Sequence, residues 1–159
     1  MTIRIGSGYD VHAFARDRAL VLGGVTIPYE YGLAGHSDAD TVIHAVVDAL
    51  LGAAALGDIG THFPSSDPRW KNQPSSVFLD YSYELLRQAG WTINNVDATI
   101  IAERPKLAPH IPAMRAHLAE HLRLDISQVS VKATTTDGLG FTGRGEGIAC
   151  SAVALIERP

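Results

Sequence analysis

The sequence predicts a two-layer α/β sandwich, an α+β fold in which helices cover one face of a mixed sheet. Strand-like apolar segments stand at both ends of the chain, and three helix-like segments lie between them. The 159 residues match the length of one ordinary domain and contain no repeat or linker. We therefore expect residues 1–159 to form a single domain.

The first half of the chain predicts three strands and one long helix. Residues 2–14 alternate apolar and polar side chains, and residues 20–28 predict two short strands joined at Gly23-Gly24. The clearest helix covers Ser37 to Leu56, because Ser37 or Asp38 can cap it and Gly57 can end it. Apolar residues recur along it, so this helix should be largely buried. They are Val42, Ile43, Val46, Val47, Leu50 and Leu51.

The second half alternates helices and strands. Residues 57–74 contain three prolines and predict a long mobile loop, a kind of segment that is often functional. The residues that follow predict a helix at 75–89, a strand at 96–102, a helix at 109–122, a strand at 129–135 and a final strand at 148–156. A glycine-rich stretch at 137–147 precedes the final strand.

Composition excludes several classes of protein. Hydrophobic residues make up 46% of the chain and charged residues 19%, which excludes a disordered protein and favours an oligomer interface. A net charge of −4 argues against a main role in binding nucleic acid. A single cysteine, Cys150, excludes an intrachain disulfide and fits a reducing compartment. No apolar run could span a bilayer and no signal peptide is evident, so a cytoplasmic protein is expected.

Polar residues in the first strand and the first helix suggest a metal site. Asp10 and His12 are two apart in an extended segment, so both project from the same face. Asp40, His44 and Asp48 are spaced by four and form one stripe on the helix. If strand and stripe meet, one carboxylate and two imidazoles describe a catalytic zinc-type site. The alternative is that Asp10 caps a turn and the histidines are hydrogen-bonded core residues.

A second histidine motif lies on the predicted helix at 109–122. His117, Glu120 and His121 match the H-x-x-E-H zinc-peptidase pattern. The buried face of this helix is already supplied by other residues, so we interpret the motif as a helix face exposed to water. Those apolar residues are Ile111, Met114, Leu118 and Leu122.

The segment 132–147 has the composition of an anion site. Lysine, threonine hydroxyls and Asp137 stand at a strand end, followed by five glycines and Arg144. Glycines let backbone N–H groups approach phosphate, and a carboxylate beside them can hold Mg²⁺. A flexible hairpin would have the same composition. Neither a P-loop nor a Rossmann glycine motif occurs.

Five motifs together carry a resemblance to a known family. They are SGYDVH at 7–12, GHSDAD at 35–40 with His44, AAALGDIG at 53–60, PHIP at 109–112 and ATTTDGLGFTGRGEG at 133–147. They resemble the 2-C-methyl-D-erythritol 2,4-cyclodiphosphate synthases, enzymes of the non-mevalonate route to isoprenoid precursors. The resemblance covers essentially the whole chain, in the right order.

The resemblance implies a reaction and its metal ions. The family converts 4-diphosphocytidyl-2-C-methyl-D-erythritol 2-phosphate into the cyclic diphosphate and releases CMP. It implies that Asp10, His12 and His44 bind Zn²⁺. It further implies that Asp137 binds a second divalent ion, Mg²⁺ or Mn²⁺.

The resemblance also implies residues that bind the substrate. His36 and Ser37 would contact the methylerythritol phosphate end beside Asp10 and His12, with residues 62–70 closing over it. Asp58 and Gly60 would hold the ribose, and Thr134 and Thr135 the diphosphate. The cytosine pocket would be formed by Ala102, Pro105, Lys106, Leu107 and Ala108. The catalytic residues would be His36, Thr135 and Asp137.

The family is a homotrimer with active sites between subunits, so the resemblance implies the same assembly. Phe141 and Arg144 would face the trimer axis, where an isoprenoid-like ligand sits in some members.

The sequence departs from the usual family residues at four positions. Asp137 replaces glutamate, Ser65 replaces aspartate, Arg104 replaces a small residue and Ser151 replaces an acidic one. Two other functions use the same residues: a metal-dependent hydrolase of phosphoanhydrides, and a trimeric nucleotide-sensing module without catalysis.

Overall fold

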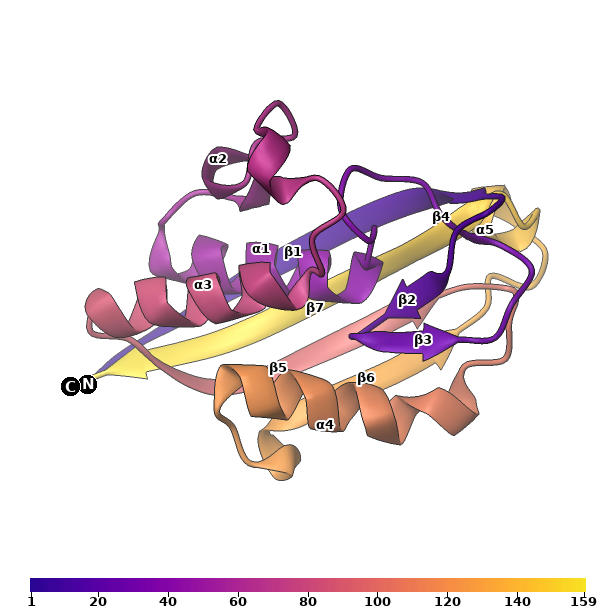
Figure 1. Ribbon diagram of the computed structural model, residues 1–159. Helices are drawn as coiled ribbons and strands as arrows, with labels where there is room; N and C mark the ends of the chain where they lie inside the picture. The colour runs from indigo at the N-terminus through magenta and orange to yellow at the C-terminus, as the bar shows by residue number, and fades with distance from the viewer.

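Two long antiparallel strands form the spine of the computed structural model, which describes residues 1–159 (Figure 1). Strand β1 (Thr2–Ala15) pairs with β7 (Gly147–Arg158) along almost its entire length. The register runs from Thr2 opposite Arg158 to Ala13 opposite Gly147, so the two termini lie side by side at one end of the molecule.

The sheet is mixed, as predicted. Its strand order is β4-β1-β7-β5-β6, and only β5 and β6 run parallel to each other. Strands β2 and β3 form a separate hairpin whose turn, Gly23-Gly24, has the positive φ angles that favour glycine. The bounds are β2 (Leu20–Leu22), β3 (Val25–Ile27), β4 (Gly32–Leu33), β5 (Thr92–Ile101) and β6 (Val129–Thr134).

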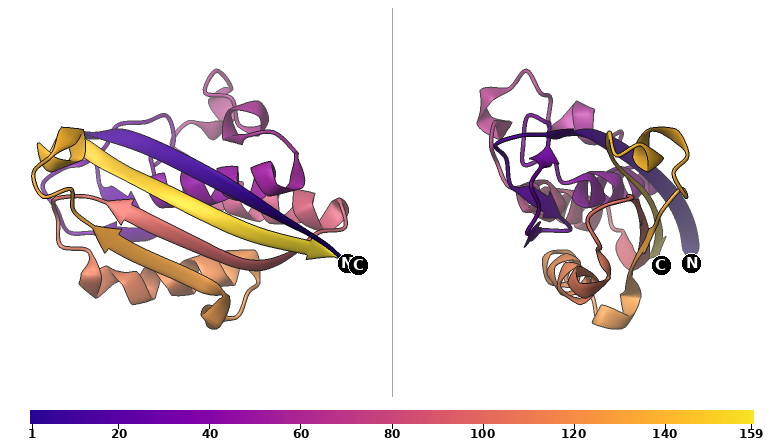
Figure 2. Two further views of the ribbon diagram at one scale, coloured as in Figure 1. Left: turned by 180° about the vertical axis from the view of Figure 1, so that it is seen from behind. Right: turned by 90° about the vertical axis from the view of Figure 1, so that its right-hand side faces the viewer.

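Three helices cover one face of this sheet. Helix α1 (Thr41–Ala54) packs on β1 and β7, α3 (Ser76–Gln88) packs beside α1, and α4 (Ile111–Leu122) packs on β6. Seen from behind, the opposite face of the sheet carries no helix (Figure 2). The predicted two-layer arrangement is confirmed. No helix has the length and apolar character needed to cross a membrane.

Helix α1 lies unusually close to β1, because two glycines on the strand remove the side chains between them. A Cβ atom at Gly8 would lie 2.0 Å from the Ala45 carbonyl oxygen, and one at Gly6 would lie 2.0 Å from the Ala49 carbonyl oxygen. The helix backbone therefore rests directly on the strand. This contact sets the distance between His44 on α1 and the side chains of β1.

The buried and exposed faces of β1 differ sharply. The face toward α1 is buried at Gly6 and Gly8, which lie against Ala45, Ala49 and Ala53 of a core of 37 buried hydrophobic residues. The bare face carries exposed apolar side chains, with Ile5 70% exposed. This exposed row, here called the outer row, consists of Ile3, Ile5, Tyr9 and Val11 on β1 and Val153 on β7.

Three expectations about local structure need correction. Helix α1 begins at Thr41 rather than Ser37, because Ala39 has a φ of 56° that no helix continues and Asp40 provides the cap. The predicted structureless loop contains α2 (Ile59–His62) and a 3-10 helix at Pro68–Trp70. The glycine-rich stretch contains the short helix α5 (Gly140–Gly143). Two further 3-10 helices lie at Ala108–His110 and Ile126–Gln128.

Candidate metal and nucleotide site

The structure brings Asp10, His12 and His44 together, so the strand and the helix meet as the spacing predicts. Asp10 Oδ2 lies 2.9 Å from His12 Nε2 and 3.3 Å from His44 Nδ1. The two histidine nitrogens are 3.3 Å apart. All three ligand atoms lie within 4.8 Å of one another, and this is the only group of three or more metal-ligating side chains in the chain.

Each histidine makes a hydrogen bond on the far side of its ring. His12 Nδ1 lies 2.6 Å from the Ala34 carbonyl oxygen, which can only accept. In the neutral ring the hydrogen is therefore on Nδ1, and Nε2 presents a lone pair to the cluster. His44 Nε2 lies 2.9 Å from Ser75 Oγ and 3.2 Å from Ser37 Oγ, which leaves its Nδ1 facing Asp10.

The electrostatics of the cluster favour a cation. Burial alone would raise the pKa of Asp10, but in the metal-free chain hydrogen bonds and charges from His12 and His44 lower it to about 2. In the neutral tautomers described above, both imidazole nitrogens turn lone pairs toward Asp10 Oδ2, which is buried and then has no donor in the chain. Two imidazole nitrogens and one carboxylate oxygen are a ligand set that zinc accepts, with a fourth position open. The residues present therefore fit the ion that the resemblance implies.

Asp40 and Asp48 do not join this cluster, although they share its helical spacing. Asp40 caps α1 and accepts backbone N–H groups from Val42, Ile43, Gly23 and Gly24 at 2.7–3.1 Å. Burial raises the pKa of Asp40 to about 6. Asp48 accepts the Ile59 N–H at 2.8 Å. The predicted polar stripe thus contributes one ligand, His44, and two carboxylates that bind backbone.

A pocket of about 280 Å³ opens beside the Asp10–His12–His44 cluster. It is lined by the polar side chains of His12, His36, Ser37 and His44 and by three aromatic rings in mutual contact, here called the aromatic wall: Phe63, Trp70 and Phe78. The indole nitrogen of Trp70 is buried and has no hydrogen-bond partner in the chain. The remaining lining residues are Ile59, Gly60 and Ser65.

The loop that carries His36 and Ser37 is held from two sides. Arg18 donates to the carbonyl oxygens of Gly35 at 2.7 Å and Ser37 at 2.6 Å. Asn72 donates its backbone N–H to the His36 carbonyl oxygen at 3.0 Å. Sequence reasoning missed Arg18, because nothing in its neighbourhood in the chain indicates that its side chain reaches this loop.

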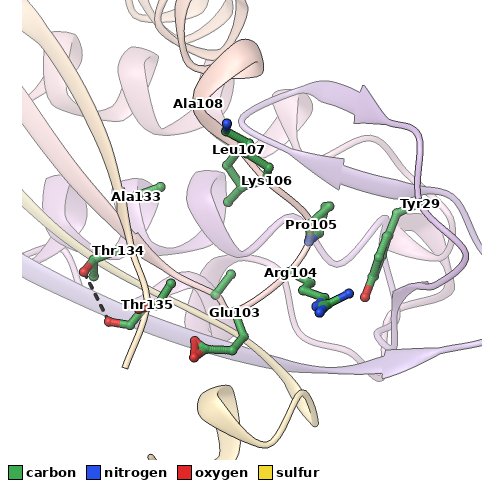
Figure 3. Close-up of a pocket in the computed structure, with 11 residues that line it drawn as sticks. Tyr29, Glu103, Arg104, Pro105, Lys106, Leu107, Ala108, Ala133, Thr134 and Thr135 are labelled. Atoms are coloured by element: carbon green, nitrogen blue, oxygen red, sulfur yellow. Dashed lines mark hydrogen bonds between the residues drawn. The ribbon is translucent and has the colours of Figure 1, made fainter. Parts of the chain in front are cut away.

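A second pocket of about 570 Å³ lies where the parallel strands β5 and β6 end (Figure 3). Tyr29 and Arg104 stand at one side of it, and Thr134 and Thr135 at the other. All residues that the resemblance assigns to the cytosine pocket line it. These are Ala102, Pro105, Lys106, Leu107 and Ala108. Tyr29 and Glu103 also line this pocket and were not predicted.

Asp137 lies on an exposed turn beside this second pocket. Thr135 Oγ1 donates to Asp137 Oδ1 at 3.2 Å, and the following Gly138 N–H donates to Glu103 Oε1 at 2.8 Å. Asp137 itself has a φ of 53°, in the left-handed region. The carboxylate is therefore presented by a turn held against the pocket loop, apart from the Asp10–His12–His44 cluster.

The remaining predicted residues lie around these pockets. Asp58 caps α2, where Thr61 donates to its carboxylate. Gly60 lines the smaller pocket and Asp58 does not. Arg144 pairs with Glu146 at 3.1 Å and, with Tyr29 and Arg104, lines a shallow depression of about 260 Å³. Phe141 lies half-buried on α5.

The H-x-x-E-H motif is only partly exposed to water. Glu120 is exposed, and His121 Nδ1 lies 2.7 Å from Asp80 Oδ1. His117 instead packs its ring against Gly24, and its Nε2 is buried without a partner. The expected water-exposed face is therefore wrong for His117, because the β2–β3 hairpin covers it. The motif forms no group of three metal-ligating atoms.

Comparison with known proteins decides the family. Residues 3–157 match the YgbB family model, which is nearly the whole chain. The chain belongs to the YgbB family. This confirms the resemblance seen in the sequence.

Relatives within the YgbB family are closely similar. A 2-C-methyl-D-erythritol 2,4-cyclodiphosphate synthase of Geobacter metallireducens is 60% identical over 156 residues, which cover 98% of this chain and 99% of the relative. The structure of the bifunctional IspDF from Campylobacter jejuni has a TM-score of 0.95 and 42% identity. It matches 99% of this chain, which spans 43% of that longer one.

A YgbB-family structure with a nucleotide is also similar. It is IspF of Plasmodium falciparum in a CDP complex, with a TM-score of 0.86 and 36% identity. The match covers 98% of this chain and 96% of that one. The chain therefore belongs to a family of enzymes, and the two pockets described above are the candidates for its active site.

Proposed function

We propose that this YgbB-family chain is a 2-C-methyl-D-erythritol 2,4-cyclodiphosphate synthase, acting in non-mevalonate isoprenoid precursor biosynthesis as a single domain over residues 1–159. It would convert 4-diphosphocytidyl-2-C-methyl-D-erythritol 2-phosphate to the cyclic diphosphate and CMP. The observation that carries this proposal is the Asp10–His12–His44 cluster opening onto a pocket, in a chain whose relatives bear that name.

The metal ions have distinct places in this proposal. Asp10, His12 and His44 would hold Zn²⁺ and Asp137 a second divalent ion, Mg²⁺ or Mn²⁺. Divalent ions bound there would neutralise charge on the diphosphate and its leaving group. Asp137 offers a single carboxylate on an exposed turn, so substrate phosphate and water would complete the coordination of the second ion.

The larger pocket suits the cytidine end of the substrate. The 102–108 loop lines it with apolar and backbone groups, which can contact a base and its edge, and with the charged side chains of Glu103, Arg104 and Lys106. Thr134 and Thr135 stand at its edge. Their hydroxyls donate to the Thr135 carbonyl oxygen and to Asp137 Oδ1 in the ligand-free chain, and would turn to donate to the diphosphate. The CDP complex of the Plasmodium falciparum relative supports a cytidine diphosphate ligand.

The smaller pocket suits the methylerythritol phosphate end. His36 and Ser37 would donate to the phosphate, and the aromatic wall would contact the methyl-bearing carbon chain. The unpaired Trp70 N–H is a further donor at this wall, because a buried N–H without an acceptor is costly unless a ligand satisfies it.

The reaction is an intramolecular phosphoryl transfer. An oxygen of the 2-phosphate attacks the β-phosphorus, the bond from that phosphorus to the bridging oxygen breaks, and CMP departs with that oxygen. The nucleophile belongs to the substrate, so the protein has to position the chain and neutralise charge. His36 and Thr135 would donate to oxygens whose charge rises in the transition state.

Two observations support a homotrimer with active sites between subunits. The outer row leaves apolar side chains exposed on the bare sheet face, where a partner could cover them. The two pockets share no lining residue within one chain, although one substrate would have to reach both. A neighbouring subunit would bring Asp58 and Gly60 to the ribose. Phe141 and Arg144 would then face the axis, where an isoprenoid-like ligand could bind.

Product analysis tests the activity. The purified chain, supplied with zinc, magnesium and the diphosphocytidyl substrate, should release CMP and the cyclic diphosphate in equal amounts. An open-chain product would instead indicate a metal-dependent hydrolase. Binding of the substrate with no CMP release would indicate a nucleotide-sensing module. Either result would overturn the proposed synthase.

A further inference from the structure

Ser75 stands at the N-cap of α3, but its side chain does not cap that helix. A serine at this position normally accepts a backbone N–H of the first turn, and Ser75 makes no such hydrogen bond. The residue is completely buried, with 0% of its surface exposed. Its hydroxyl must therefore find partners elsewhere, because a buried hydroxyl without a hydrogen bond is costly.

Asp38, which precedes α1, and His44 on α1 both contact this hydroxyl. Ser75 Oγ lies 2.9 Å from His44 Nε2 and donates a short hydrogen bond to Asp38 Oδ1. The other carboxylate oxygen of Asp38 accepts the backbone N–H of Ser75 at 3.0 Å. Asp38 thus fixes both the hydroxyl and the backbone of Ser75 beside the histidine.

The direction of each hydrogen bond follows from the chemistry of the groups. A carboxylate only accepts, so the Ser75 hydroxyl hydrogen points to Asp38. The same oxygen can then only accept from the imidazole, which places the ring hydrogen of His44 on Nε2. His44 Nδ1 is left with its lone pair, and this atom faces Asp10 Oδ2 at 3.3 Å.

We propose that Ser75 and Asp38 are positioning residues for the metal centre, which hold His44 as the Nε2–H tautomer with Nδ1 directed at the ion. Outer hydrogen-bond partners of this kind orient metal-binding histidines and raise their basicity. For His12 the corresponding partner is the Ala34 carbonyl oxygen. The inference rests on the proposed function only in taking Asp10, His12 and His44 as the zinc site.

Ser37 carries the second hydroxyl near His44 Nε2, and its role differs from that of Ser75. Its Oγ lies 3.2 Å from His44 Nε2 and accepts the Ala39 N–H at 3.3 Å. Both contacts use its lone pairs, so its own hydrogen stays free for a ligand in the smaller pocket. Ser75 makes the shorter contact and is the one tied to a carboxylate.

The chain of hydrogen bonds from Asp38 through Ser75 to His44, here called the relay, also connects the metal centre to the aromatic wall of the smaller pocket. Ser75 follows directly on the segment whose Phe63 and Trp70 line the smaller pocket. Because Asp38 holds the Ser75 backbone, it fixes the end of that segment relative to His44.

Zinc affinity of matched serine variants tests the proposal. Ser82 lies on the same helix, is equally buried, and donates its hydroxyl only to the Phe78 carbonyl oxygen, so Ser82→Ala is the control for Ser75→Ala. By chelator competition on the full chain, Ser75→Ala should weaken zinc binding about 10- to 100-fold. Ser82→Ala should leave it unchanged. Equal zinc affinity in Ser75→Ala and the wild type, or equal losses in both variants, would overturn the proposal.

Two further measurements keep the test decisive if Ser75→Ala folds poorly. Asp38→Asn keeps the size of the side chain but can present its NH₂ to Ser75, and it should also weaken zinc binding. In ¹⁵N spectra of the zinc-loaded wild type, His44 should coordinate through Nδ1 and carry its hydrogen on Nε2. Coordination through Nε2, or unaltered zinc affinity in Asp38→Asn, would contradict the relay.

Zinc uptake by the wild type distinguishes a failure of the metal site from a failure of the Asp38–Ser75–His44 hydrogen bonds alone. A wild-type chain that takes up no zinc overturns the metal site and the relay together. A wild type that binds zinc, with Ser75→Ala and Asp38→Asn binding it equally well, overturns the relay alone.

Discussion

Protons and zinc compete for the side chains of Asp10 and His12. Burial alone would lower the pKa of His12, but the hydrogen bond and charge of Asp10 raise it above 6.5. In the zinc-free protein this pair therefore stabilises the fold below pH 6.5, and the contribution is lost as pH rises through the raised pKa of His12. The Asp10 contribution has the opposite sign, since it is present above pH 3.8 and lost as pH falls toward about 2.

We expect zinc to raise the melting temperature by an amount that grows from about pH 6 to about pH 8. Zinc needs His12 without its proton, and the zinc-free protein loses the proton-dependent contribution over the same range. Scanning calorimetry of zinc-loaded and zinc-free protein would measure the difference. A constant difference across this range would contradict the expectation.

His44→Ala should remove one ligand and lower both zinc content and turnover, the latter by at least about 100-fold. The matched control is His121→Ala, because His121 pairs with Asp80 on α3 and lies outside both pockets. Metal analysis and CMP release would be measured on both. Full zinc content and normal turnover in His44→Ala would show that this side chain is not a ligand.

At the scale of elements, the contact between β1 and α1 sets the metal site. Gly8→Ala should destabilise the fold by about 3 kcal/mol or more, since its Cβ would lie 2.0 Å from the Ala45 carbonyl oxygen. It should also weaken zinc binding, because α1 carries His44 and would be pushed away from the strand. Urea unfolding and zinc titration are the measurements.

The control for this substitution lies on α1 itself. Gly52 is exposed and a Cβ there would meet nothing closer than 4.0 Å, so Gly52→Ala should stabilise the helix by about 0.5–1 kcal/mol. If Gly8→Ala were as stable as the wild type, the close approach of strand and helix could not be what positions His44.

The long elements were predictable from sequence, and the segments between them were not. Periodicity located α3 and both terminal strands. In α3 and β7 the apolar face is buried in the core, whereas the alternating apolar residues of β1 belong to the exposed outer row. It placed the start of α1 four residues early, since Ser37 and Asp38 look like caps but serve the histidine relay and the pocket. Propensity cannot distinguish a capping serine from one used in this way.

The site was predictable only where its chemistry shows in residue type. Asp10, His12 and His44 have a metal-ligand spacing that strand and helix geometry interpret directly. The larger pocket, which we propose binds the nucleotide, is lined mainly by residues of the 102–108 loop, and these look like any loop without the family resemblance. Arg18 and Ser75 reach the site across 17 and 31 residues of sequence, so only the fold shows their contacts.

At the scale of the whole molecule, a substitution in the outer row can test whether the chain forms the expected trimer. Ile5→Asp places a charge on the bare sheet face and should convert the expected trimer to single chains, with loss of turnover if sites lie between subunits. Ile126→Asp is the control, because Ile126 is also exposed but lies on a 3-10 helix away from that row. Light scattering after gel filtration would report the mass. A wild type that already runs as a single chain would refute the trimer.

Because the outer ends of β1 and β7 adjoin, the order of the elements along the chain can be changed by circular permutation. Thr2 pairs with Arg158, so a short peptide from Pro159 back to Met1 would close a hairpin (Figure 1). A circularly permuted gene could then open the backbone at the Gly90 turn, where no atom lies near the missing side chain. Such a protein would begin at β5. Both pockets would stay intact, because neither includes residues at the linked termini or at the new chain ends beside Gly90.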